Sequence, residues 1–216
     1  MNETTRTALV TGGASGMGEA TSLRLAREGR RVAIVDIDDA GARRVAQQIT
    51  DLGGKAIAVT ADIADKAQIA TALSAVRAEL GPVTILINNA AVENFCPIAD
   101  IDEANWDRVM AVNLKAVFLL TQAVLPDMIE AGWGRIINIS AFGAQIGATE
   151  MAHYTASKGG VISMTRSLAI ELGAKGIEVI GEQTFWGWPE YAVDPAETAN
   201  WHALIAKYDC VPVSHD

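Results

Sequence analysis

The chain has 216 residues, a formal net charge of -9 and a hydrophobic content of 50%, which suits a single α/β domain and disfavours a nucleic-acid partner. Its two cysteines, Cys96 and Cys210, stand far apart, and its three histidines are scattered, so neither a disulfide framework nor a metal site is expected. Neither a signal-like N-terminus nor an uninterrupted apolar segment of membrane-spanning length stands out, so a cytoplasmic protein without a membrane partner is expected.

Short β-branched runs alternate with longer Ala-rich amphipathic stretches along most of the chain, which is typical of repeated βα units. The sequence predicts strands at Ala8–Thr11, Arg31–Asp36, Ala56–Thr60, Val83–Asn88, Arg135–Ser140 and Ile177–Ile180. It predicts helices at about Gly16–Glu28, Asp39–Leu52, Lys66–Leu80, Glu103–Ala131 and Ala152–Ala174. Right-handed crossovers then give a doubly wound parallel sheet of the Rossmann type.

We expect one domain, with residues 1–180 as its dinucleotide-binding and catalytic core. Residues 181–216 form an atypical C-terminal segment, in which the regular alternation ends and three of the five tryptophans gather. Its aromatic cluster Phe185, Trp186 and Trp188 is interpreted either as a cover for a substrate or as an exposed apolar patch.

A glycine-rich turn, TGGASGMG at Thr11–Gly18, joins the first predicted strand to the first predicted helix. In that context glycines permit a tight turn and a close approach to a pyrophosphate, and the helix N-terminus supplies amide donors. A purely structural turn is the weaker alternative. The turn lacks the Lys-Ser/Thr ending of a nucleotide-triphosphate loop. Its expected cofactor-binding residues are Gly12, Ser15, Gly16, Met17 and Gly18.

Asp36 ends the second predicted strand, eighteen residues after Gly18. A carboxylate there can accept hydrogen bonds from the ribose hydroxyls of NAD and would repel the 2'-phosphate of NADP. Neither Ser15 nor Ile37 supplies the cation that NADP requires. NAD is therefore the expected cofactor, although Asp36 is also open to interpretation as a cap for the following turn.

Tyr154 and Lys158 are spaced i to i+4 on a predicted helix, so their side chains share one face. A nearby ammonium favours ionisation of a phenol, whose ordinary pKa is about 10. If the Ser140 hydroxyl reaches the same point, the three groups suit proton transfer coupled to hydride transfer. Taken alone, such a pair is more often an ordinary amphipathic one.

Taken together, TGGASGMG, NNAA at Asn88–Ala91, VNL at Val112–Leu114, Ser140 and YTASK resemble the short-chain dehydrogenase/reductase family over residues 7 to about 180. The resemblance implies an NAD-dependent oxidoreductase that interconverts a secondary alcohol and a ketone. It implies that Tyr154 is the acid/base, that Lys158 binds the nicotinamide ribose and lowers the tyrosine pKa, and that Ser140 orients the substrate oxygen. It also implies that the backbone of Asn113 holds a relay water.

The resemblance further implies that Asp62 and Ile63 contact the adenine ring and that Asn89 and Ala90 line the cofactor. A helix cap explains Asp62 nearly as well. A solvent-facing position for Asn113 and a strand-end turn for Ser140 are the weaker alternatives. Where the family has an Asn and then a Pro-Gly turn after its sixth strand, this chain reads IGEQTFWGWPEY. The alternative function is therefore a catalytically impaired dinucleotide-binding protein.

The substrate expected from this resemblance is a small alcohol or ketone. Pocket walls are expected at Val92–Cys96, at Phe142–Gly147, at Thr149 and Glu150, and near Trp186. The helices Glu103–Ala131 and Ala152–Ala174 carry apolar residues on more than one face, which favours a homo-oligomer, a dimer or a tetramer.

Overall fold

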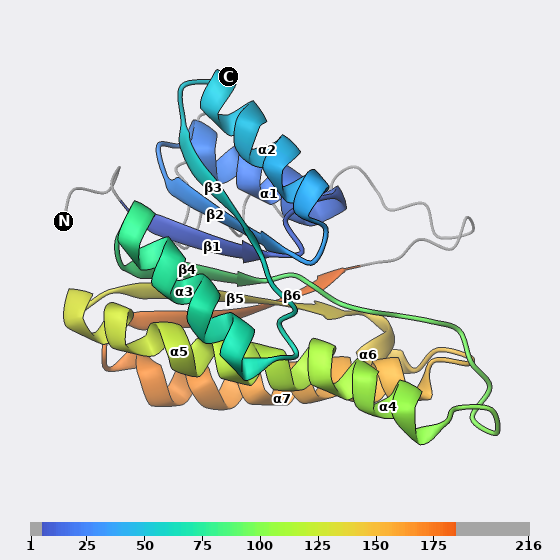
Figure 1. Cartoon of the computed structure of the whole chain (residues 1–216). Coiled ribbons are helices and arrows are strands. Elements are labelled where there is room, and N and C mark those ends of the chain that lie inside the picture. Colours follow the sequence, from blue (N-terminus) through green and yellow to red (C-terminus); the bar gives the residue numbers. More distant parts are fainter. Residues whose placement is uncertain (1–5, 185–216) are drawn as a thin grey trace, which may run out of the picture.

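A computed structural model describes residues 6–184 as one α/β unit around a six-stranded sheet (Figure 1). The strand order is β3-β2-β1-β4-β5-β6, and all five pairings are parallel. The strands are β1 (Thr7–Thr11), β2 (Arg31–Asp36), β3 (Lys55–Thr60), β4 (Val83–Asn88), β5 (Gly134–Ala141) and β6 (Ile177–Thr184). The order reverses between β1 and β4, which is where ligands bind in doubly wound sheets.

Helices cover both faces of the sheet (Figure 1). They are α1 (Gly16–Arg27), α2 (Asp39–Asp51), α3 (Lys66–Leu80), α4 (Glu103–Met110), α5 (Ala116–Ala131), α6 (Gly143–Ile146) and α7 (Ala152–Gly173). Apolar residues of α1 and α2 pack on one face of the sheet, and those of α3, α5 and α7 pack on the other. The predicted doubly wound architecture is confirmed.

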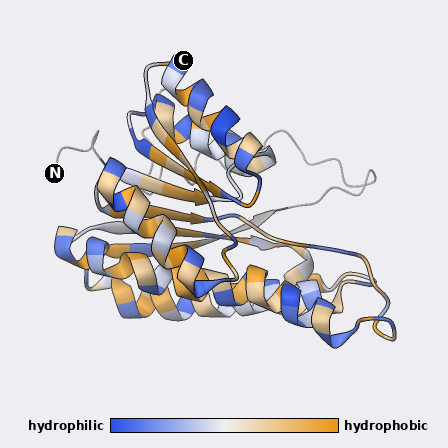
Figure 2. Cartoon of the chain, in the orientation of Figure 1, coloured by the Kyte–Doolittle hydropathy of each residue, from blue (hydrophilic) through white to orange (hydrophobic). Residues whose placement is uncertain are grey.

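Successive residues of β1 show why the sheet is buried on both sides. Ala8 and Val10 belong to the core beneath α1 and α2, whereas Leu9 belongs to the core beneath α3 and α5. Because side chains alternate along a strand, a strand covered on both faces reads as a continuous apolar run. Figure 2 shows this apolar character along the central strands, with hydrophilic residues on the outer helix surfaces.

The longest predicted helix, Glu103–Ala131, is interrupted. A π-helical segment, Ala111–Lys115, separates α4 from α5 and contains the buried Asn113. Such bulges accommodate an inward-turned residue and are frequent at functional sites. The strand β6 also continues to Thr184, four residues beyond the predicted end at Ile180.

One helical stretch has the length and mean hydropathy of a membrane span, although polar residues such as Asn113 and Lys115 interrupt its apolar run. The continuous helical stretch Glu103–Ala131 has 29 residues and a window of mean hydropathy 1.6, of which 50% is buried inside the fold. Its apolar residues Ala116, Leu120 and Val124 belong to the core under the sheet. The stretch is therefore a buried core helix of the α/β unit.

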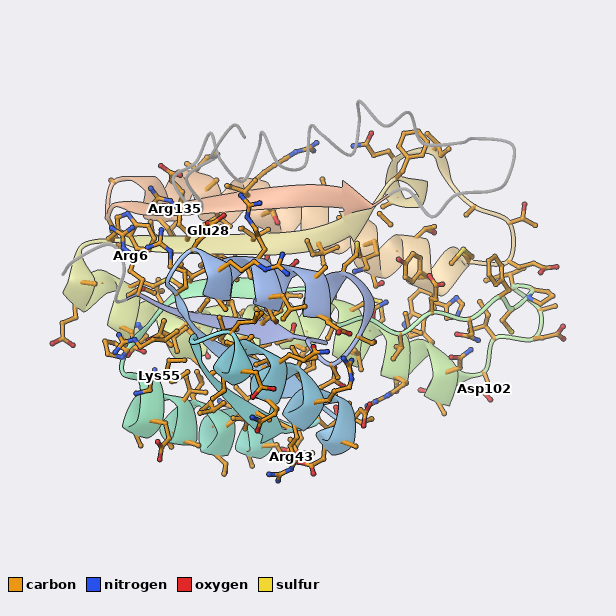
Figure 3. The ribbon with its side chains drawn as sticks, turned by 90° about the horizontal axis from the view of Figure 1, so that it is seen from above. Arg6, Glu28, Arg43, Lys55, Asp102 and Arg135 are labelled. Carbon is orange, nitrogen blue, oxygen red and sulfur yellow. The ribbon has the colours of Figure 1, made fainter. Side chains whose placement is uncertain are left out.

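The two ends of the sheet differ in the side chains that gather there. Seen from above, Arg6, Arg135 and Glu28 lie together at the amino ends of the strands, and Asp102 lies at the far end beyond the carboxyl ends (Figure 3). The glycine-rich turn and the connection from β4 to α4 belong to the carboxyl end. The aromatic cluster Phe185, Trp186 and Trp188 lies outside the described residues.

Candidate active site

The glycine-rich turn connects β1 to α1, and its backbone packs closely against itself and against the residues that follow β4. Gly12 has a φ of +63°, and a Cβ there would lie 2.9 Å from the Cα of Ala90. A Cβ on Gly18 would lie 2.0 Å from the carbonyl oxygen of Gly12. Only glycine fits these two positions. Between them Ser15, Gly16 and Met17 are exposed at the N-terminus of α1, where amide donors favour an anion.

The hydroxyl of Thr11 joins this turn to the end of β4. It accepts hydrogen bonds from the backbone nitrogens of Asn89 and Ala90, both at 3.1 Å. The amide of Asn89 donates to the carbonyl oxygens of Thr11 at 2.9 Å and Gly12 at 3.1 Å. The side chain of Asn89, expected to line the cofactor, thus holds the turn itself. The sequence analysis quoted Thr11 within the motif but gave it no role.

Asp36 lies at the end of β2 and faces the glycine-rich turn. Its carboxylate accepts hydrogen bonds from the backbone nitrogens of Ala14 and Asp38, both at 3.0 Å. Asp38 is the residue that caps α2, because its side chain accepts from the nitrogen of Gly41. The capping interpretation therefore applies to Asp38, and the adjacent Ile37 is 66% exposed.

A cation on α2 also contacts the glycine-rich turn, a role that was not predicted from the sequence. Arg44, on α2, donates to the carbonyl oxygen of Ala14 at 2.9 Å and forms a two-pronged pair with Glu19, each contact 2.7 Å long. This pairing lowers the pKa of Glu19 through its hydrogen bond with Arg44. Little in the sequence indicates this role for Arg44, because the residue lies in the middle of α2 and not next to the end of β2.

Asp62 and Ile63 follow β3 and differ in what they can offer an adenine ring. Asp62 accepts from the nitrogen of Ala64 and pairs with Arg108 at 2.9 Å; the backbone hydrogen bond is the main cause that lowers its pKa. The cap of α3 is Asp65. The side chain of Ile63 is 7% exposed and packs in the core.

The predicted catalytic trio lies at the carboxyl end of β5 and on α7. Tyr154, Lys158 and Ser140 are all buried, and the Lys158 ammonium lies over the Tyr154 ring, 5.9 Å from its centroid. Lys158 Nζ donates to the carbonyl oxygen of Ile139 at 2.8 Å. The Ser140 hydroxyl donates to the carbonyl oxygen of Lys158 at 3.0 Å. The serine must therefore turn away from α7 before it can donate to a substrate oxygen.

The expected lowering of the tyrosine pKa is not found in the chain alone. Burial raises the pKa of Tyr154 to about 12, and the negative charge of Glu93 adds to the effect. Burial lowers the pKa of Lys158 to about 8, against the opposing influence of Glu93. Burial is the larger cause for both groups, and it raises the pKa of Tyr154 although the Lys158 ammonium lies beside the ring.

Asn113 is fully buried in the π-helical segment, so the solvent-facing interpretation is wrong. Its side-chain oxygen accepts from the nitrogen of Val92 at 2.8 Å, and its amide donates to the oxygen of Val92 at 2.9 Å. The same amide lies 3.2 Å from the hydroxyl of Ser157 on α7. The side chain of Asn113 thus fixes the connection that follows β4.

Three buried polar side chains link the sheet to α7, and the sequence analysis found none of these links. The amide of Asn88 donates to Asn138 at 2.8 Å, and the amide of Asn138 donates to the hydroxyl of Thr165 at 2.9 Å. Polar groups in the centre of a sheet are stabilising when they are paired. Because Thr165 shares α7 with Tyr154, these bonds help to fix the helix that carries the phenol.

Two hydrogen bonds join the connection after β4 to the segment that leads into α7. The nitrogen of Cys96 donates to the carbonyl oxygen of Glu150 at 2.7 Å. The ring of His153, buried on α7, donates from Nε2 to the side-chain oxygen of Asn94 at 3.0 Å. Both contacts hold the connection from β4 to α4 against the segment that leads into α7. The predicted wall near Trp186 lies outside the described residues.

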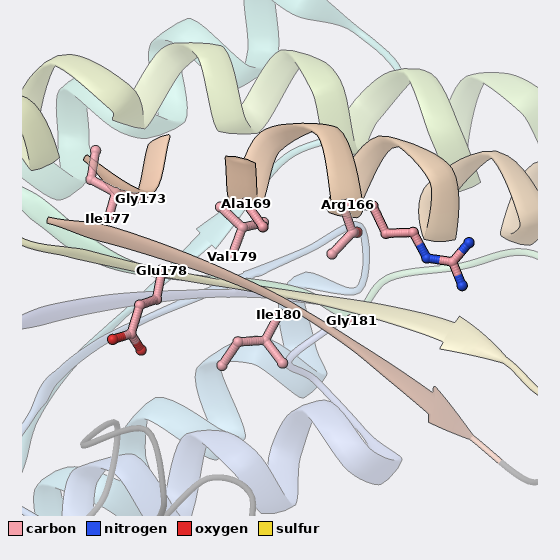
Figure 4. A pocket seen from close by; sticks show the side chains of 9 residues that line it. Arg166, Ala169, Gly173, Ile177, Glu178, Val179, Ile180 and Gly181 are labelled. Carbon is pink, nitrogen blue, oxygen red and sulfur yellow. The ribbon is translucent and has the colours of Figure 1, made fainter. Parts of the chain in front are cut away.

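A separate hollow of about 350 Å³ lies along the outer edge of the sheet, between α7 and β6 (Figure 4). Ala169 and Ile177 line it, together with Arg166, whose side chain reaches along the helix. It includes neither the trio nor the glycine-rich turn. The chemistry of the side chains therefore places the candidate site at the carboxyl end of the sheet and not in this hollow.

A family model described as short chain dehydrogenase matches residues 6–184. The chain belongs to the short-chain dehydrogenase family. Family membership agrees with the strand order, the glycine-rich turn and the arrangement of Tyr154 and Lys158 described above.

Characterised relatives act on different alcohols. A (2S)-[(R)-hydroxy(phenyl)methyl]succinyl-CoA dehydrogenase subunit of Thauera aromatica is 42% identical over 174 residues, which are 81% of this chain and 70% of that protein. The D-threitol dehydrogenase of Mycolicibacterium smegmatis is 38% identical over 174 residues, 81% of this chain and 67% of that protein. These matches show a short-chain dehydrogenase that transfers hydride between a nicotinamide dinucleotide and an alcohol or ketone.

The fold also matches solved structures. A metagenomic short-chain oxidoreductase in complex with NADP has a TM-score of 0.82 and 35% identity, over 93% of this chain and 90% of that chain. The family and this likeness show a nicotinamide dinucleotide as cofactor. They do not decide between NAD and NADP.

Proposed function

We propose that this short-chain dehydrogenase uses NAD to interconvert a secondary alcohol and a ketone, with Tyr154 as the acid/base. The observation that carries the proposal is the buried Tyr154–Lys158 pair at the carboxyl end of the sheet. The glycine-rich turn at the same end has no room for a Cβ at Gly12 or Gly18, which fits the close approach of a pyrophosphate.

A bound nicotinamide dinucleotide supplies or accepts the hydride. Tyr154 keeps its proton in the chain alone, since burial raises its pKa to about 12. In ketone reduction the protonated phenol donates to the forming alkoxide. In alcohol oxidation the phenol must first ionise, and a positive charge nearby makes this easier.

Lys158 holds such a charge beside the ring of Tyr154 and is itself positioned by the carbonyl of Ile139. With a pKa of about 8 it stays mostly protonated at neutral pH. Ser140 donates to the backbone of α7 and is placed to exchange that partner for a substrate oxygen. Asn113 contributes by fixing the loop after β4.

Asp36 supports the preference for NAD over NADP. A carboxylate at the end of β2 accepts hydrogen bonds from ribose hydroxyls and repels a phosphate. Arg44, a cation on α2 that contacts the glycine-rich turn, is engaged in its pair with Glu19. The test is steady-state turnover with NADH and NADPH for the wild type and for Asp36→Ala. A wild-type preference for NADPH would remove the proposal.

Turnover of a panel of secondary alcohols and ketones tests the activity itself, and NADH fluorescence tests binding. Binding of NADH without turnover of any substrate in the panel would favour a catalytically impaired dinucleotide-binding protein instead. Asp62 and Ile63, which follow β3, are proposed to contact the adenine ring, and Asn89 and Ala90, which follow β4, to line the cofactor.

We propose a homo-oligomer built on the outer faces of α5 and α7. A groove of about 830 Å³ lies between α7 and the stretch from α4 to the start of α5. Apolar side chains such as Leu114, Phe118 and Met164 line it together with Asp107 and Lys115, and Phe118 is 48% exposed. Such an apolar groove on an outer helix face favours association. Light scattering tests it, with a monomer as the contrary result. A cytoplasmic location is proposed with it, and cell fractionation checks that.

A further inference from the structure

A cation and an anion bind the two backbone groups of the same residue in the glycine-rich turn. The nitrogen of Ala14 donates to the Asp36 carboxylate at 3.0 Å, and its carbonyl oxygen accepts from Nη2 of Arg44 at 2.9 Å. Ala14 itself is 3% exposed, so the residue between the two charged groups is packed in place. The guanidinium of Arg44 is therefore one residue away from the carboxylate that is proposed to meet the adenosine ribose.

Glu19, in the first turn of α1, holds this guanidinium in a fork-shaped ion pair. Both Nη1 and Nη2 of Arg44 donate to the Glu19 carboxylate, each at 2.7 Å. Nη1 also lies 3.4 Å from the side-chain oxygen of Gln48. Two parallel bonds to a carboxylate are the strong form of such a pair, and the same fork suits a phosphate. A phosphate beside the turn must therefore compete with Glu19 for Arg44.

The charges around Arg44 are mostly negative. The hydrogen bond with Glu19 raises the pKa of Arg44 above its usual value, and the charges of Glu19 and Asp38 act in the same direction against desolvation. Asp38 accepts from the nitrogen of Gly41 at 3.1 Å and so keeps a fixed place at the start of α2. With Asp36, three carboxylates thus stand against one guanidinium. A further negative group at this point meets repulsion that Arg44, as paired, does not offset.

We propose that Glu19 is a positioning residue for cofactor choice: by pairing with Arg44 it withholds that guanidinium from the 2'-phosphate of NADP. The inference rests on the proposed preference for NAD and adds a second cause of it to the charge of Asp36. Removal of the Glu19 charge leaves the bond from Arg44 to the Ala14 oxygen in place. The released cation should therefore stay at the turn, where a 2'-phosphate can use it.

AMP and adenosine 2',5'-bisphosphate test this, because the two nucleotides differ only in the 2'-phosphate. Calorimetric titration into the full chain gives both dissociation constants, and their ratio measures the preference for the 2'-phosphate. The background is Asp36→Ala, since the Asp36 carboxylate itself repels a phosphate. In this background we compare Glu19→Gln with the combination of Glu19→Gln and Arg44→Gln. A glutamine at position 44 keeps an amide donor of the kind that the Ala14 oxygen accepts.

In the Asp36→Ala background, Glu19→Gln should raise the preference for the bisphosphate by about tenfold, as one charge-assisted contact with a phosphate implies. The added Arg44→Gln should remove that gain. Asp39→Asn is the matched control, because it makes the same change in net charge and releases Arg43, the neighbour of Arg44 on α2. Arg43 points outward from the helix (Figure 3), so the preference should change by less than about twofold.

A preference unchanged by Glu19→Gln would overturn the inference. A gain that survives Arg44→Gln, or that Asp39→Asn reproduces, would overturn it as well. So would loss of AMP binding on either substitution in the pair, because Glu19 and Arg44 would then hold the turn itself.

Failure of the proposed function gives a different result. Wild-type turnover that favours NADPH would remove the proposed NAD preference, whereas a gain in Glu19→Gln that depends on Arg44 would still support the role of Glu19. A wild type that binds neither nucleotide would remove the dinucleotide site and both proposals with it.

Discussion

Removal of the Asn113 side chain should weaken both the fold and the substrate loop. Asn113→Ala deletes the partners of the Val92 nitrogen and oxygen and the contact with Ser157. An unpaired buried polar group costs about 1–3 kcal/mol. Val92 is half-buried, so water can reach it in part. We therefore expect a total loss of about 2–4 kcal/mol, against a stability of roughly 5–15 kcal/mol for a typical domain.

Urea unfolding at fixed protein concentration measures this loss. For a slope of about 2–3 kcal/mol per molar, the midpoint should fall by about 1 M. Asn105→Ala is a matched control, since it makes the same substitution on α4 where the described contacts assign the side chain no hydrogen bond. In Asn113→Ala, KM should rise more than kcat falls, because the loop that borders the substrate is released. A midpoint equal to that of the control would refute the reasoning.

Three further outcomes are expected. Tyr154→Phe should abolish turnover while NADH fluorescence still reports binding; retained activity would take the acid/base role from this residue. The difference in phenolate absorbance between the wild type and Tyr154→Phe reports Tyr154 alone. In the cofactor-free protein this difference should stay flat through pH 10, because burial raises the pKa of Tyr154 to about 12. Bound NAD should shift the onset of the absorbance to lower pH. A phenolate signal below pH 10 without cofactor would contradict this. Gly18→Ala places a Cβ 2.0 Å from the Gly12 oxygen, so the affinity for NADH should fall by about thirtyfold or more. A Cβ at Gly173 meets no atom within 4 Å, so the control Gly173→Ala should keep the wild-type affinity for NADH.

The sequence predicted the order of strands and helices well, because alternating burial and glycine positions are local patterns. It also predicted that Tyr154, Lys158 and Ser140 come together, since a strand end and one helix face define their places. It missed the break at Ala111–Lys115, because no residue type marks a π-helical segment in an apolar helix.

The net shift in the pKa of Tyr154 in the chain alone is opposite to the one expected, for a reason that a sequence does not contain. Spacing places a lysine near the phenol, but the sign of the pKa shift depends on how far burial removes both groups from water. Likewise Arg44 and Thr11 gain their roles from segments that lie far away in the chain. Arg44 bonds Ala14, and Thr11 bonds Asn89, only because the fold brings these distant segments together.

The bonds from Asn88 through Asn138 to Thr165 fix α7 from within the sheet, whereas Asn113 and His153 hold the connection after β4 from its other side. The two sets of anchors share no residue. Loss of Asn94 would free the ring of His153, the neighbour of Tyr154 on α7. A chimera that alters the connection after β4 should therefore keep Asn94, so that the exchange disturbs the anchors inside the sheet as little as possible.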